Sequence, residues 1–194
     1  MHHRIAAALL AASAFTAQAG TAWDEAVDGD FANDGLQPTQ VAFVAGHNVM
    51  IGSTGDAGAG VDRDYFSFTI PAGNVLSALW LLPNTFVSGG ASFFAIQAGP
   101  QLTVTPTGGG IAALYGFGHY DNSMVGTDIL LAMVGPAKSP VPAGTYTVWV
   151  QETGGPASYG LDFVLTPVPE PATALSLGAG LLGLGCRRFV LQRR

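Results

Sequence analysis

Cysteine and basic side chains are scarce in this 194-residue chain, which has one cysteine and seven lysines and arginines. The only cysteine, Cys186, lies close to the C-terminus, so the residues before it cannot form a disulfide with one another. Between residues 20 and 167 only Arg63 and Lys138 oppose twelve acidic residues, which gives this segment a net charge of −10. Contacts to phosphate need clustered lysine and arginine. We therefore expect no nucleic-acid partner.

Sequence signatures of catalysis are also lacking. The chain has no G-x-S-x-G motif, and the glycine-rich segment 55–60 lacks the lysine of a phosphate-binding loop. After residue 20 the histidines are His47 and His119, and neither has an evident partner in the sequence. With two distant histidines and no cysteine in this segment, a zinc site is not expected. We predict that the protein is not an enzyme and has no catalytic residues.

Both ends of the chain carry export features. A short basic start, an apolar segment at residues 5–15 and the sequence Ala17-Gln18-Ala19 predict a signal peptide over residues 1–19. At the other end, residues 172–186 are uncharged and apolar, and arginines follow them. This stretch is shorter than the roughly 20 residues of a comfortable membrane span. Flanking arginines favour a cytoplasmic C-terminus, so we expect a C-terminal transmembrane helix that anchors an outward-facing protein.

The C-terminal pattern resembles the PEP-CTERM sorting signal of Gram-negative bacteria, which exosortase recognises and removes. The resemblance covers residues 168–194. It implies an inner-membrane-anchored precursor, processing by exosortase, and a final place at the cell surface or in the medium. An ordinary C-terminal anchor is the alternative. The expected sorting residues are Val168, Pro169, Glu170, Pro171, Arg187, Arg188, Arg193 and Arg194.

The segment between the two signals, residues 20–167, is predicted to be one all-β domain. It shows no long helical periodicity, and apolar residues alternate with polar ones in several short runs separated by glycine and proline. We expect an antiparallel β-sandwich, jelly-roll-like. The residues predicted to face its core are Phe66, Phe68 and Ile70; Tyr146, Val148 and Val150; and Tyr159, Leu161, Phe163 and Leu165.

The same segment resembles the bacterial pre-peptidase C-terminal domain. The resemblance rests on Asp62-Arg63-Asp64-Tyr65-Phe66, the later Pro-Ala-Gly-Thr-Tyr run at residues 142–146, and Tyr159-Gly160-Leu161-Asp162-Phe163. It implies an accessory jelly-roll module of the kind appended to secreted enzymes. Some members bind calcium or polysaccharide.

Acidic residues gather in two places. Five lie between residues 24 and 34, and Asp62 and Asp64 stand just before an expected strand. Calcium takes six to eight oxygen ligands, and carboxylates are prominent among them. We therefore name Asp28, Asp30, Asp62 and Asp64 as candidate calcium ligands. A solvated acidic surface that needs no cofactor is the alternative.

Aromatic side chains provide a second candidate site. Residues 114–120 are expected to form a loop in which glycines expose the rings of Tyr115, Phe117 and Tyr120 to a glycan. Trp80 and Trp149 are further candidates. Trp149 falls on the strand face opposite Tyr146 and Val148, so it faces either solvent or a covering loop.

Together these features predict an exported, exosortase-processed protein of the cell surface or the extracellular matrix of a biofilm. We expect a structural or adhesive role in the exopolysaccharide layer, with polysaccharide as a candidate partner. The alternative is a calcium- or glycan-binding accessory module.

Overall fold

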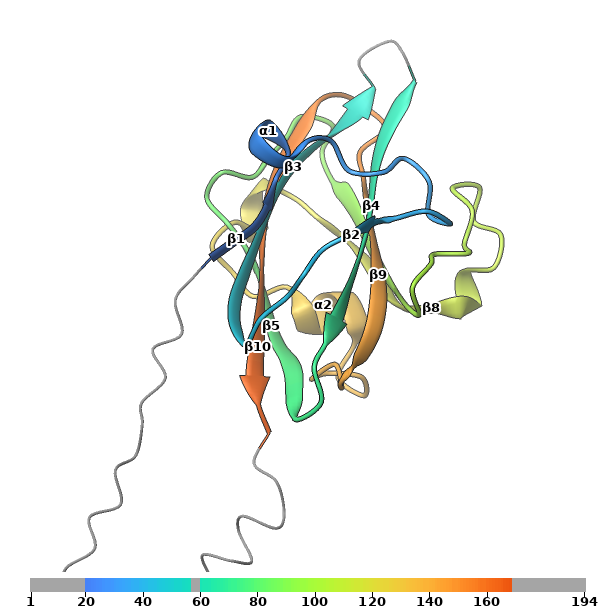
Figure 1. Cartoon of the computed structure of the whole chain (residues 1–194). Coiled ribbons are helices and arrows are strands. Elements are labelled where there is room, and N and C mark those ends of the chain that lie inside the picture. The colour runs from blue at the N-terminus through green and yellow to red at the C-terminus, as the bar shows by residue number, and fades with distance from the viewer. Residues whose placement is uncertain (1–19, 57–59, 169–194) are drawn as a thin grey trace, which may run out of the picture.

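The computed structural model of the chain describes residues 20–56 and 60–168, which form a curled and mostly antiparallel β-sheet (Figure 1). Its strands are β1 (Gly20–Asp24), β2 (Thr39–Gln40), β3 (Gly46–Asp56), β4 (Val61–Ile70), β5 (Asn74–Leu81), β6 (Phe86–Val87), β7 (Ser92–Ala98), β8 (Leu114–Tyr120), β9 (Gly144–Gln151) and β10 (Ala157–Pro167). Short helices are α1 (Glu25–Asp28), α2 (Leu130–Val134) and the 3₁₀ turns Ile111–Ala113 and Asn122–Met124.

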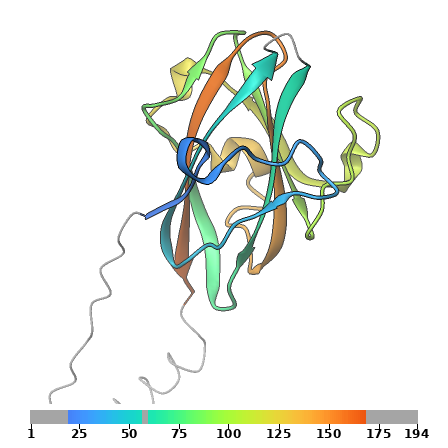
Figure 2. The same cartoon turned by 45° about the horizontal axis from the view of Figure 1, so that its top comes forward.

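The sheet has the strand order β5-β10-β3-β4-β9-β7-β8. Between strands β3 and β4 the described residues form two pairs, in which Gly55 lies opposite Asp62 and Asp56 opposite Val61. Along the rest of their length these strands belong to two sides, β5-β10-β3 and β4-β9-β7-β8, which face each other across the core (Figures 1 and 2). The predicted all-β, antiparallel class is confirmed, apart from the short parallel pairs β1–β3 and β2–β4. The finer jelly-roll topology stays a prediction.

The residues of the core follow the alternation of apolar and polar residues along the strands. Every residue predicted to face inward on β4, β9 and β10 is buried in one apolar cluster. Aromatic rings dominate its centre: Phe68 stacks on Phe43 at 4.1 Å between ring centroids and meets Phe163 edge-on at 5.3 Å. The opposing sides are therefore held together mainly by burial of large apolar rings.

The free edge of β5 is covered by the segment that leads into α2. The amide of Leu81 donates to the carbonyl of Thr127, and the amide of Ile129 donates to the carbonyl of Leu79. Leu130 and Met133 of α2 are buried against the core. This cover pairs the β5 backbone, which would otherwise present an open strand edge.

A second, smaller apolar cluster lies outside the β4-β9-β7-β8 side. Trp149 of β9 packs there with Tyr65 and with Leu102 and Val104 of the loop 99–113. Of the two environments expected for Trp149, the structure thus selects the covering loop. The loop is fixed by a hydrogen bond from the amide of Leu102 to the carbonyl of Gly35, 2.8 Å.

Within residues 20–56 and 60–168, no helix combines the length and apolar character needed to cross a membrane. The predicted signal peptide, the apolar stretch 172–186 and the sorting residues after Val168 lie outside the described residues.

Candidate functional site

The N-terminal strap, residues 20–31, carries the first part of the candidate site. Its strand β1 runs parallel to β3 and is followed at once by the single turn of α1. Asp24 caps this turn by accepting from the amide of Ala26 at 3.0 Å, and Asp28 accepts from the amide of Asp24 at 2.9 Å. These local bonds satisfy helix-end amides and fix the direction of the following residues.

Glu25 ties the strap to the sheet. Its Oε2 accepts from the amide of Ser53 on β3 at 2.7 Å and from the Ser53 hydroxyl at 3.2 Å. Its Oε1 accepts from the amide of Phe31 at 3.3 Å. The ring of Phe31 is buried in the core next to Phe66. The strap is therefore docked at both ends, and its carboxylates have defined positions.

Three carboxylates from the strap and the sheet converge. One oxygen each from Glu25, Asp30 and Asp64 lies within 4.8 Å of the other two. Asp64 is fully buried and has the same position in the β4 alternation as Phe66 and Phe68. Its Oδ2 accepts from the hydroxyl of Tyr159 at 2.7 Å, whereas its Oδ1 has no donor among the described residues. A buried carboxylate oxygen without a partner is rare and costly in a folded protein.

The electrostatics of the group follow from burial and from mutual repulsion. Burial, reinforced by the neighbouring Glu25, raises the pKa of Asp64 to about 9. Burial also raises the pKa of Glu25 to about 7, and the charge of Asp30 adds to that rise. Burial keeps the pKa of Tyr159 well above its usual value, so its hydroxyl stays protonated and donates. Near neutral pH the group therefore has to take up either protons or a cation.

The arrangement matches the needs of a hard divalent cation. All three groups offer oxygen, which Ca²⁺ and Mg²⁺ prefer, and no histidine or cysteine is among them. Calcium ligands lie about 2.3–2.6 Å from the ion, so two ligands on one ion can be no more than about 5 Å apart. The spacing of the three oxygens satisfies this condition.

The structure brings together two of the four predicted calcium ligands, Asp30 and Asp64. Asp28 is not in the group, because its carboxylate is used to cap the Asp24 amide. Asp62 is also outside the trio, although burial and the nearby Asp30 raise its pKa. Glu25 was missing from the predicted ligands. The sequence feature that could have indicated Glu25 is its place in the acidic run of the strap. The sequence does not reveal that α1 turns the Glu25 side chain toward β4.

Of the predicted glycan residues, Tyr120 is contradicted. It lies in the core at 1 % exposure, because it ends strand β8 on the inward face rather than belonging to a loop. Tyr115 is half-buried, donates its hydroxyl to the carbonyl of Lys138 at 3.0 Å and lies under the Lys138 ammonium. Phe117 is 46 % exposed and Trp80 40 %. The three predicted rings therefore do not form one exposed platform.

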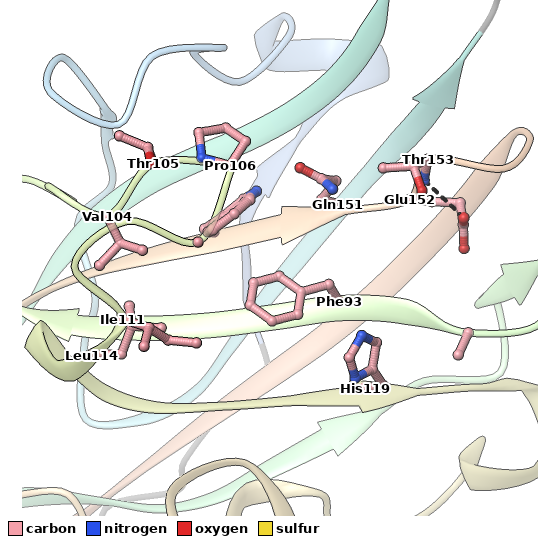
Figure 3. A pocket seen from close by; sticks show the side chains of 13 residues that line it. Phe93, Val104, Thr105, Pro106, Ile111, Leu114, His119, Gln151, Glu152 and Thr153 are labelled. Carbon is pink, nitrogen blue, oxygen red and sulfur yellow. Dashed lines mark hydrogen bonds between the residues drawn. The ribbon is translucent and has the colours of Figure 1, made fainter.

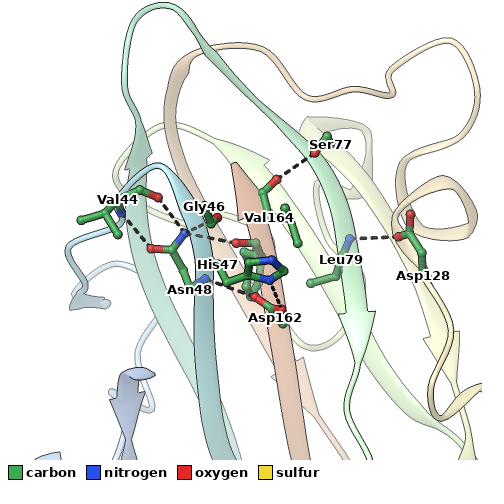
Figure 4. A network of polar contacts seen from close by, with 10 residues as sticks. Val44, Gly46, His47, Asn48, Ser77, Leu79, Asp128, Asp162 and Val164 are labelled. Carbon is green, nitrogen blue, oxygen red and sulfur yellow. Dashed lines mark hydrogen bonds and ion pairs between the residues drawn. The ribbon is translucent and has the colours of Figure 1, made fainter. Parts of the chain in front are cut away.

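His47 does have a partner, which the sequence did not reveal (Figure 4). Its Nδ1 lies 2.6 Å from Oδ2 of Asp162 on the neighbouring strand, and Oδ1 of Asp162 accepts from the amide of Asn48 at 3.2 Å. The Asn48 side chain extends this network to the carbonyls of Val44, Gly46 and Phe163. Among the described residues no hydroxyl or thiol hydrogen-bonds to His47. The network links β3 to β10 and the chain before β3.

The fold and the converging carboxylates thus define an all-β module with a candidate cation site. A comparison with family models identifies a PEP-CTERM protein-sorting motif at residues 167–188. The chain therefore carries the sorting signal that its C-terminal sequence indicated, which implies export and processing by exosortase, a membrane enzyme. A comparison with curated proteins gives no significant match, and a comparison with solved structures gives none either. The resemblance to the pre-peptidase C-terminal domain is not confirmed.

Proposed function

We propose that the exported module binds a divalent cation of the calcium type through Glu25, Asp30 and Asp64 and has a structural or adhesive role outside the cell. Two observations carry the proposal: the three carboxylates converge, and one buried oxygen of Asp64 has no hydrogen-bond partner among the described residues. A cation supplies the missing partner and removes the repulsion between the three groups.

The bound cation would fasten the N-terminal strap to the sheet. Glu25 and Asp30 belong to the strap, whereas Asp64 belongs to β4. One ion shared among them therefore joins the start of the exported module to its core. This is a stabilising role, because an ion that binds only the folded state shifts the folding equilibrium toward that state.

The proposed role in an extracellular polysaccharide layer is supported by the sorting motif and the acidic composition of the module. An extracellular setting supplies calcium to sites with weak affinity as well as strong affinity. The proposal includes no enzymatic step.

The test is a calcium titration of the purified chain, followed by calorimetry and by melting temperature. Calcium at about 100 times its dissociation constant should add about 2.7 kcal/mol to the free energy of unfolding. Asp64→Asn should abolish this gain, because it removes the charge and keeps the shape. Asp28→Asn is the matched control from the same acidic run and should keep the gain, since Asp28 lies outside the trio.

Equal melting temperatures in excess chelator and in millimolar calcium would contradict cation binding. A gain that survives Asp64→Asn but disappears in Asp28→Asn would place the ion elsewhere on the strap. After either result, cation binding by Glu25, Asp30 and Asp64 would no longer support the structural or adhesive role.

A further inference from the structure

A pocket that shares no residue with the carboxylate group lies on the outer face of the β4-β9-β7-β8 side. It lies between strands β7, β8 and β9 and the loop 99–113, and its volume is about 250 Å³. Phe93 occupies its centre, with Val104 and Pro106 of the loop on one side and Gln151 and Glu152 on the other (Figure 3). The pocket is smaller than the roughly 300–1,000 Å³ of sites for drug-sized ligands, so it suits a single ring.

The apolar part of the pocket is held by contacts between β7, β9 and the loop 99–113. Phe93 is half-buried and meets Trp149 edge-on, with 4.8 Å between ring centroids. The loop that forms the opposite wall is fixed by Thr103, whose amide donates to Oε1 of Gln97 at 3.0 Å. A ligand would therefore meet a preformed aromatic surface and would not have to order a loop.

The polar part of the pocket is held in place as well. Glu152 is buried, and its Oε1 accepts from the amides of Thr153 and Gly154, both at 2.8 Å. The amide oxygen of Gln151 accepts from Nε of Arg63 at 2.6 Å, which leaves its NH₂ group without a hydrogen bond among the described residues. His119 adds an exposed imidazole at the rim. Acceptors and donors thus stand beside the aromatic ring in fixed positions.

We propose that this pocket binds a neutral pyranose unit of a polysaccharide. A pyranose has one apolar face of C–H groups, which can lie on the ring of Phe93, and an equatorial rim of hydroxyls, which can donate to Glu152 and accept from Gln151. An anionic sugar is disfavoured by the Glu152 carboxylate. A purely apolar ligand would cover the NH₂ group of Gln151 without giving it a hydrogen-bond partner. Trp149 also lines the pocket, and its buried indole N–H has no acceptor among the described residues.

This site differs from the predicted glycan platform. Phe117 is on the adjacent strand β8 and its ring centroid lies 6.3 Å from that of Phe93, but it does not line the pocket. The two sites can therefore be separated by substitution. The proposal does not depend on cation binding by Glu25, Asp30 and Asp64.

The experiment uses the full chain, purified in a detergent without a sugar headgroup. Methyl pyranosides of glucose, galactose, mannose and N-acetylglucosamine are tested by saturation-transfer NMR, with choline as a cationic probe, in calcium and in chelator. At least one pyranoside should receive saturation, most strongly at C–H protons of one ring face. Phe93→Leu, which keeps an apolar side chain but loses the flat ring, should raise the Kd about three- to tenfold.

Three further variants test whether the sugar binds at this pocket. His119→Ala changes an exposed rim residue and should also weaken binding, whereas Phe86→Ala, at another exposed phenylalanine, should not. Each variant is checked for an unchanged near-ultraviolet spectrum. Absence of transfer to every pyranoside would overturn the proposal, as would binding of choline alone. Binding that is lost in Phe117→Ala but kept in Phe93→Leu would assign the sugar to the predicted platform instead.

Discussion

At the scale of single residues, the position of Asp64 carries the most information. It has the same parity on β4 as Phe66, Phe68 and Ile70, so the strand directs a carboxylate into the space where the next core side chain would lie. A lone carboxylate in that place is unfavourable. The hydroxyl of Tyr159 and the approach of Glu25 and Asp30 give it a defined environment. The cost of burying it is consistent with a binding role, because binding sites often hold groups with shifted pKa values.

The same burial predicts the pH dependence of the cation-free protein. The folded-state pKa values of Glu25 and Asp64, about 7 and about 9, are both above their ordinary values of 4.5 and 3.8. Such groups contribute stability that is complete below about pH 4 and is lost as the pH rises through the folded-state values. In excess chelator the melting temperature should therefore fall between about pH 5 and 9.

Comparison with Asp64→Asn isolates the effect of this one group from the general repulsion of an acidic protein. The amide cannot ionise, so the variant should lose less stability than the wild type in the upper half of this pH range. Calcium should also flatten the wild-type curve, because it favours the ionised carboxylates. A wild-type melting temperature in chelator that is constant or rises over this range would show that Asp64 is not held in its neutral form.

At the scale of secondary-structure elements, the long strands could be predicted and the contacts across the chain could not. Alternation identified the inward faces of β4, β9 and β10, because each of these strands has one buried face. The expected loop over residues 114–120 is in fact strand β8. Gly116 and Gly118 favoured a loop in the sequence, but in the structure they leave room for α2 to pack directly on β8. Alternation within one strand does not predict contacts between residues far apart in the sequence. Two such contacts are the pairing of His47 with Asp162 and the approach of Glu25 to Asp64.

Packing of α2 on β8 predicts a penalty for any side chain at Gly116. A Cβ there would lie 2.5 Å from the carbonyl oxygen of Met133 and 2.7 Å from Cα of Val134. Because both are backbone atoms, α2 would have to move, and Gly116→Ala should cost about 1–3 kcal/mol. Gly109→Ala is the control, since its Cβ would meet only the hydroxyl oxygen of exposed Thr105. Equal urea midpoints for the two variants would contradict the close contact between α2 and β8.

The inward face of β4 predicts a second stability effect. Phe68 is 2 % exposed and contacts Phe43, Tyr146 and Phe163. Phe68→Ala should therefore reduce the free energy of unfolding by about 3–5 kcal/mol. Phe86→Ala removes a ring that is 59 % exposed and should change it by less than about 0.5 kcal/mol. Denaturant unfolding of both variants measures the difference, and a small loss for Phe68→Ala would mean that this ring does not pack in the core.

At the scale of the whole molecule, charge is divided between the module and the ends of the chain. The module holds twelve of the thirteen acids, whereas four of the seven basic residues are arginines in the last eight positions. This division suits a protein whose acidic part is exported and whose basic end is retained on the cytoplasmic side. The sorting motif begins at residue 167, where β10 ends, so no further described element separates the folded module from the signal. The domain limits at residues 19 and 167 stay predictions.

This arrangement predicts which changes block maturation. Pro169 and Pro171 flank Glu170, and proline is unfavourable within a helix, so we expect exosortase to recognise this motif apart from the apolar stretch. Arginines that follow this stretch should hold its end in the cytoplasm. Glu170→Ala, or deletion of Arg187, Arg188, Arg193 and Arg194, should therefore leave full-length protein in the membrane fraction of the native host. Fractionation and immunoblotting measure the ratio of precursor to processed protein.

Asp34→Ala removes an acid from an exposed loop of the module and should mature normally. Normal processing of both tail variants would mean that the matched motif is not the signal that directs cleavage.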